Sequence, residues 1–160
     1  MTYVYFEEEI NKETVQELVD RLSSIEGEIK LWFSSVGGLA TPMYFLLDYL
    51  NSRQEEITVV LIDEVCSAGF FILTDFCGKI ELSEHLDYLM VHKIDRRVFT
   101  LKRDKIYSED ELVKQTEESN KQLLEKLKKL GLNKEQLEEF DKGYDVVLYR
   151  KDFKQLKIER

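Results

Sequence analysis

Two hydrophobic periods follow one another along the first sixty residues. Over 15–22 the apolar residues recur three and four positions apart, which predicts a helix that Asn11 can cap. Over 29–33 apolar residues occupy every second position, which predicts a strand. A second helix is expected over about 41–52, and the run 57–62 is apolar throughout. Such a run is typical of a strand that is buried on both faces of a parallel sheet.

The same alternation of strands and helices continues to about residue 92. A third helix is expected to begin near Ser67 and to end at Gly78, followed by two short strands over 79–82 and 88–92. Strands that alternate with helices favour right-handed crossovers and a parallel sheet. The sequence therefore predicts an α/β fold with a mostly parallel sheet.

The second half of the chain has a different pattern. Residues 93–105 carry a net charge of +4 and contain a possible strand over 98–101. A long helix is expected over 109–130, closed by Gly131, with leucines at its ends and a polar middle over 115–122. A helix of this kind often projects from its domain or meets a partner, although it can also pack on its own domain. Beyond it, Asn133 and Gln136 have the spacing of a capping box, and 146–148 is expected to be a last strand.

Composition and charge narrow the class of protein. The chain has 160 residues, enough for a single domain over 1–160, and 43% of them are hydrophobic. The net charge of −9 argues against a nucleic-acid binder, and two cysteines and two histidines are too few for a zinc ribbon or a disulfide framework. Both cysteines lie in apolar runs, which predicts two reduced, buried thiols. Because no signal peptide opens the chain and no apolar run can span a bilayer, we expect no membrane contact and a cytoplasmic protein.

Three places in this pattern can carry chemistry. Gly37 and Gly38 form a turn between a strand and a helix, where backbone N–H groups can approach a ligand. Ser67 lies at a strand-to-helix turn, where a hydroxyl can act as a nucleophile, and His92 ends a buried strand. Taken singly, each also has an ordinary structural role, as a turn, a helix N-cap and a core histidine.

The order and spacing of these residues resemble those of the ClpP family, the proteolytic subunits of Clp proteases, within the crotonase-like fold. Gly38, Ser67, His92 and Asp141 are separated by 29, 25 and 49 residues. The segments that carry the resemblance are IKLWFSSVGG over 29–38, ITVVLIDEVCSAG over 57–69, LMVHK over 89–93 and EQLEEFDKGYDVVL over 135–148. The resemblance covers most of the chain and implies repeated ββα units with a projecting "handle" over about 93–131.

The resemblance also implies a mechanism. Ser67 matches the nucleophile, His92 the general base, and Asp141 the acid that orients the histidine, with Asp145 as the alternative third member. The N–H groups of Gly38 and Ala68 match the oxyanion hole. No metal or organic cofactor is needed for this chemistry.

Substrate and assembly follow from the same resemblance. Peptides or unfolded polypeptides are the expected substrates, held by Gly37 and by a strand that includes Val98, Phe99 and Thr100. We expect a homo-oligomer, with stacked rings as in the family. Because the chain begins almost at its first core strand, we do not expect it to engage a Clp-type ATPase.

Two other functions remain open on the sequence. A catalytically silent ClpP-like scaffold or binding module is suggested by the basic, glycine-free stretch after His92, where the family has a glycine-rich one. A crotonase-type enzyme acting on acyl-CoA would use the Gly37–Gly38 turn but would leave Ser67 and His92 without a role.

Overall fold

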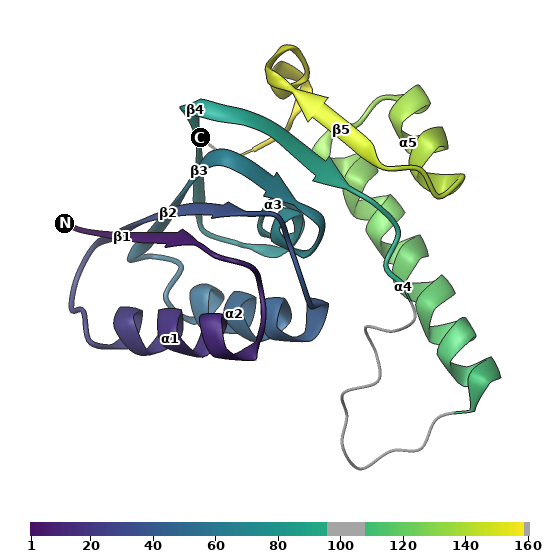
Figure 1. Cartoon of the computed structure of the whole chain (residues 1–160). Coiled ribbons are helices and arrows are strands. Elements are labelled where there is room, and N and C mark those ends of the chain that lie inside the picture. Colours follow the sequence, from purple (N-terminus) through teal and green to yellow (C-terminus); the bar gives the residue numbers. More distant parts are fainter. Residues whose placement is uncertain (96–107, 159–160) are drawn as a thin grey trace.

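The strands of the computed structural model lie side by side in chain order, in one five-stranded sheet (Figure 1). The structure describes residues 1–95 and 108–158. The strands are β1 (Thr2–Glu7), β2 (Ile29–Ser35), β3 (Ile57–Cys66), β4 (Lys79–Val91) and β5 (Val146–Tyr149). The helices are α1 (Lys12–Ser23), α2 (Ala40–Ser52), the 3-10 turn η1 (Ser67–Phe70), α3 (Phe71–Asp75), α4 (Glu109–Leu130), α5 (Lys134–Asp141) and the 3-10 turn η3 (Arg150–Gln155).

The sheet is parallel from β1 to β4, and β5 is antiparallel to β4. Each parallel pair needs a crossover connection, and α1 and α2 supply the first two on one face of the sheet (Figure 1). This confirms the prediction of an α/β fold with a mostly parallel sheet.

The core lies between that face of the sheet and the helices. Alternate residues of the strands, such as Phe6, Leu31 and Leu61, are buried together with the predicted apolar face of α1. On the other face Tyr5 is exposed and stacks on Trp32, with ring centroids 5.9 Å apart. The sheet therefore has one face inside the main core and one face outside it.

The helix ends follow the local signals in the sequence. Asn11 caps α1 in a capping box with Thr14, and Asn133 caps α5 in a capping box with Gln136. Gly131 ends α4 in a left-handed conformation. These predicted caps are confirmed.

Helix α4 differs along its length in what it contacts. Leu123, Leu127 and Leu130 are buried in the core, so the carboxyl-terminal half packs on its own domain. The first half is largely exposed, and Val113 is 37% exposed there.

The predicted strand over 98–101 lies outside the described residues. In the part of the chain that the structure describes, no helix has the length and apolarity to cross a membrane.

Three predictions about strands β3 and β4 and the connection between them need correction. The strands expected over 79–82 and 88–92 are one strand, β4, which shifts its register on β3 instead of ending at the polar residues 83–85. Strand β3 also continues past residue 62, because Asp63 takes a positive φ of 51° in the same irregularity. Cys66 is buried as expected, but Cys77 is exposed, since α3 ends at Asp75 and leaves it in the connection to β4.

Candidate active site

Ser67 is the first residue of η1 and directly follows the last residue of β3, at the carboxyl edge of the parallel strands. Cys66 is extended, with φ −127° and ψ 152°, whereas Ser67 has a positive φ of 55°. A left-handed conformation costs a non-glycine residue about 1–2 kcal/mol. The turn thus holds the serine in an uncommon conformation and leaves it half-buried.

The pairing of β3 with β4 brings His92 to this serine. Cys66 pairs with Met90, so the residues that follow the two strands emerge at the same edge of the sheet. The His92 Nε2 atom lies 2.9 Å from the Ser67 Oγ atom, which is hydrogen-bond distance. Two residues that are 25 positions apart in the sequence therefore lie at the distance that a nucleophile and its general base require.

The other ring nitrogen of His92 determines which nitrogen carries the proton. His92 Nδ1 lies 2.7 Å from the main-chain oxygen of Lys93. A carbonyl oxygen can only accept, so we assign the proton of the neutral ring to Nδ1. The Nε2 atom is then unprotonated and accepts the hydrogen bond of the Ser67 hydroxyl, as a general base must.

The structure does not bring Asp141 to His92. The Asp141 carboxylate lies 3.6 Å from the Lys93 ammonium and is 70% exposed. It is the last residue of α5, and its side chain points to this surface ion pair instead of the imidazole. Asp145, the alternative third member, is exposed and makes no hydrogen bond to His92. In the described geometry the carbonyl of Lys93 occupies the place that either carboxylate was expected to take.

The glycine turn after β2 packs directly against Ser67. Gly37 is buried with a positive φ of 104°, and a Cβ placed on it would lie 2.7 Å from the Cβ of Ser67 and 3.3 Å from its hydroxyl oxygen. Only a glycine leaves room for the serine here. The turn is held by buried Ser35, whose hydroxyl accepts a hydrogen bond from the Gly37 N–H and donates one to the oxygen of Glu8.

The residues predicted for the oxyanion hole follow Gly37 and Ser67 in the chain. Gly38 follows Gly37 in the turn, and its neighbours on either side bond to Ile10, which anchors the turn to the connection after β1. Ala68 follows Ser67 in η1 and is buried. Among the described residues, neither N–H group has a protein acceptor.

A polar cluster of Glu64, Tyr88 and Cys66 lies on the β3–β4 ladder, at the end of β3 that precedes Ser67. Glu64 pairs with Tyr88 across the ladder, and the Tyr88 hydroxyl donates a hydrogen bond to the Glu64 carboxylate. That hydrogen bond raises the pKa of Tyr88 well above its ordinary value, and desolvation adds to it. Desolvation raises the pKa of the Cys66 thiol, and the charge of Glu64 raises it further. Burial and this charge therefore make the Cys66 thiol a weaker nucleophile than an exposed thiol would be.

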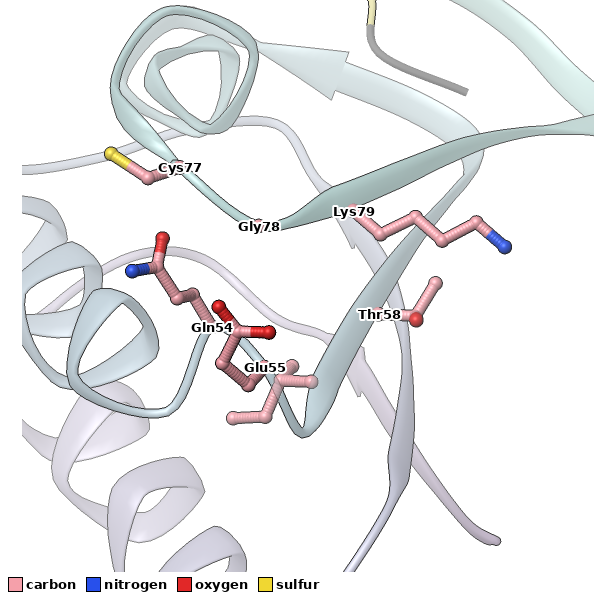
Figure 2. A pocket seen from close by; sticks show the side chains of 7 residues that line it. Gln54, Glu55, Thr58, Cys77, Gly78 and Lys79 are labelled. Atoms are coloured by element: carbon pink, nitrogen blue, oxygen red, sulfur yellow. The ribbon is translucent and has the colours of Figure 1, made fainter.

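Other predicted and possible sites lie elsewhere. Val98, Phe99 and Thr100 lie outside the described residues. At the opposite, amino ends of β3 and β4 there is an open hollow of about 470 Å³, lined by Gln54, Glu55, Ile57, Thr58, Cys77, Gly78 and Lys79 (Figure 2). Within 1–95 and 108–158, no group of three or more histidine, cysteine or acidic side chains has the arrangement of a metal site.

Sequence reasoning missed the residues that support the pair. Ser35, which holds the glycine turn, and the Lys93 carbonyl, which contacts His92, act through single contacts that leave no spacing pattern. Asn120 of α4 contacts the chain just after His92 and lies in the polar stretch that the sequence did reveal. No protein-family model matches the chain, and no curated protein matches it.

Proposed function

We propose that this protein is a ClpP-like serine peptidase, which cleaves peptides or unfolded polypeptides through an acyl-enzyme on Ser67. The observation that carries the proposal is the 2.9 Å contact between Ser67 Oγ and His92 Nε2, with the serine in a left-handed turn. A helix N-cap serine or a core histidine would need neither this contact nor this backbone conformation.

The geometry supports the following steps. The Ser67 oxygen adds to the substrate carbonyl carbon while its proton passes to His92 Nε2. The N–H groups of Gly38 and Ala68 stabilise the negative oxygen of the tetrahedral intermediate. The amine leaves with the proton from His92. Water then attacks the acyl-enzyme by the same route, giving its proton to His92, which returns one to the Ser67 oxygen.

The proposal extends to the family and its assembly. A mostly parallel sheet with a serine after β3 and a histidine after β4 agrees with the ClpP-like fold expected from the sequence. The exposed first half of α4, with Val113 on its surface, suits the handle contact by which subunits of that family interlock. We therefore propose that the active sites face a chamber enclosed by several copies of this chain.

A catalytically silent ClpP-like scaffold is the second candidate. The observation that favours it is the position of Asp141, which bonds to Lys93 and leaves His92 with a backbone carbonyl in place of a carboxylate. A carbonyl orients the imidazole, but it stabilises the imidazolium less than a full negative charge does. The two candidates differ in whether Ser67 reacts.

A fluorophosphonate probe distinguishes these candidates. The expected result is one adduct, located by mass spectrometry at Ser67, that is absent in Ser67→Ala and His92→Ala. His85→Ala is the matched control, because His85 is exposed and lies away from the site, and it should label as the wild type does. A folded wild-type protein that takes no label would refute the peptidase and leave the scaffold. Turnover of acyl-CoA that survives Ser67→Ala would instead favour a crotonase-type enzyme.

A further inference from the structure

The chain that follows His92 is held by a side chain from α4. The amide of Asn120 accepts a hydrogen bond from the Ile94 N–H at 2.7 Å and donates one to the Ile94 oxygen at 3.1 Å. A single side chain thus satisfies both main-chain groups of one residue, as the neighbouring strand of a sheet would. Ile94 is 8% exposed and packs in the core, so this point of the chain is anchored on both its polar and its apolar sides.

The peptide group between Lys93 and Ile94 connects this contact to the histidine. The carbonyl of Lys93 and the N–H of Ile94 belong to one planar unit. His92 Nδ1 donates to the oxygen of that unit, and Asn120 Oδ1 accepts from its N–H. One amide plane therefore lies between the imidazole and the asparagine, and fixing its N–H also fixes the direction of its carbonyl.

The same chain of hydrogen bonds has an electronic consequence. An amide whose N–H is engaged places more negative charge on its oxygen, so successive bonds strengthen one another. The Asn120 oxygen thereby makes the Lys93 carbonyl a better acceptor for the Nδ1 proton. This compensates in part for the carboxylate that Asp141 does not supply.

The position of Asn120 within α4 is consistent with a tertiary role. Asparagine is an unfavourable residue in the middle of a helix, because its side chain competes for backbone hydrogen bonds. Asn120 is half-buried, lies eleven residues into a 22-residue helix, and directs its amide to Ile94 instead of its own helix.

We propose that Asn120 is the positioning residue for His92, acting through the Lys93–Ile94 peptide group to hold the imidazole with its proton on Nδ1. The effect on the imidazole stands on geometry alone, whereas its effect on catalysis rests on the proposed peptidase function. Helix α4 then does more than form a surface of the domain, since it controls the protonated nitrogen of the general base.

The tautomer of His92 can be read directly by nitrogen NMR. The chain has two histidines, so a ¹⁵N-labelled sample gives two imidazole spectra, and exposed His85 is an internal reference. In the pH range where both rings are neutral, wild-type His92 should show the Nδ1–H form, whereas His85 shows the Nε2–H form that a free side chain favours. Asn120→Leu removes both hydrogen bonds at similar volume and should shift His92 towards the Nε2–H form without changing His85.

Two further variants make the comparison specific. Asn120→Asp keeps an oxygen for the Ile94 N–H but loses the donor to the Ile94 oxygen, and should retain most of the Nδ1–H form. Gln122→Ala removes an exposed amide two residues away on the same helix and should leave the spectrum unchanged. If the wild type reacts with a fluorophosphonate, Asn120→Leu should label about tenfold more slowly, since a general base contributes about 10²–10⁴-fold.

Several outcomes would overturn the proposal. A His92 spectrum that is the same in Asn120→Leu as in the wild type refutes it, and so does a wild-type His92 in the Nε2–H form. If Asn120→Leu does not fold, hydrogen exchange in the wild type decides, because the Ile94 amide must be protected and free exchange there would refute the contact. A tautomer shift in a protein that never takes the label supports the positioning role and refutes only the peptidase.

Discussion

Replacing Gly37 with alanine tests the packing of the glycine turn on the proposed nucleophile. A Cβ at this position would lie 2.7 Å from the Ser67 Cβ and 2.8 Å from the Cys66 oxygen, where ordinary contacts are 3.4–4 Å. The turn and the serine must therefore separate by roughly 1 Å. A misplacement of about 1 Å in a reacting group costs about 100-fold in rate.

The free-energy cost has two parts that can be separated. Alanine at a positive φ loses about 1–2 kcal/mol, which for a chain of this size lowers Tm by about 2–8 °C. Overpacking against Ser67 adds about 1–3 kcal/mol. Gly143→Ala is the matched control, because Gly143 has a φ of 88° and nothing within 4 Å of its added Cβ. It should show the first cost alone.

The assay is the rate of fluorophosphonate labelling at Ser67, measured together with Tm. Gly37→Ala should label about 100-fold more slowly than the wild type and melt below Gly143→Ala. Gly143→Ala should label at the wild-type rate despite its lower Tm. If the two variants label within about threefold of each other, the glycine is not needed to position the serine and the reasoning fails.

The remaining predictions concern the surroundings of the site and the handle helix. The hydrogen bond to Glu64 raises the pKa of Tyr88, so this residue contributes stability that is present below pH 10 and is lost as the pH rises above it. The midpoint of unfolding, measured from pH 9 to 11, should therefore fall less steeply with pH in Tyr88→Phe than in the wild type. Equal slopes in the two proteins would contradict this. Asp141→Asn should change the labelling rate by less than about threefold and the stability by at most about 1 kcal/mol, because the 3.6 Å ion pair with Lys93 is exposed. A labelling rate that falls about 10⁴-fold would instead show that Asp141 acts as the third member of a triad. Leu127→Ala should lower the free energy of unfolding by about 2–5 kcal/mol in denaturant titrations, because Leu127 is buried. Val113→Ala should lower it by less than about 0.5 kcal/mol in the monomer, because Val113 is exposed. Equal losses would show that α4 packs differently.

Local signals in the sequence predicted most of the fold. Helix caps at Asn11 and Asn133 and the helix end at Gly131 depend on residues within one turn of each other, so the sequence is enough to find them. The parallel sheet followed from alternating hydrophobic periods. The polar break in β4 was misread, because a shift in register lets a strand continue past residues whose side chains are exposed.

The sequence predicted the parts of the candidate site that are formed by side chains, but not the contact that is formed by a main-chain carbonyl. Ser67 and His92 were found from their order, and the β3–β4 register brings them together. A carbonyl such as that of Lys93 is present at every residue, so no sequence pattern marks it as the partner of His92. Asn120 lies 28 residues beyond His92, and only the packing of α4 shows which peptide group it contacts.

The chain-order sheet also has a consequence for how the molecule folds. Paired residues are 27 apart between β1 and β2, 28–30 apart between β2 and β3 and 21–24 apart between β3 and β4, whereas β4 and β5 pair across 55–61 residues. Shorter loops cost less entropy to close, so the pairings among the first four strands carry a smaller entropy cost than the pairing of β4 with β5. Ser67 and His92 meet across the β3–β4 pairing, whereas the contact of Asn120 with Ile94 also needs α4, which begins at Glu109. The contact between Ser67 and His92 therefore needs less of the chain in place than the contact that we propose to align the imidazole.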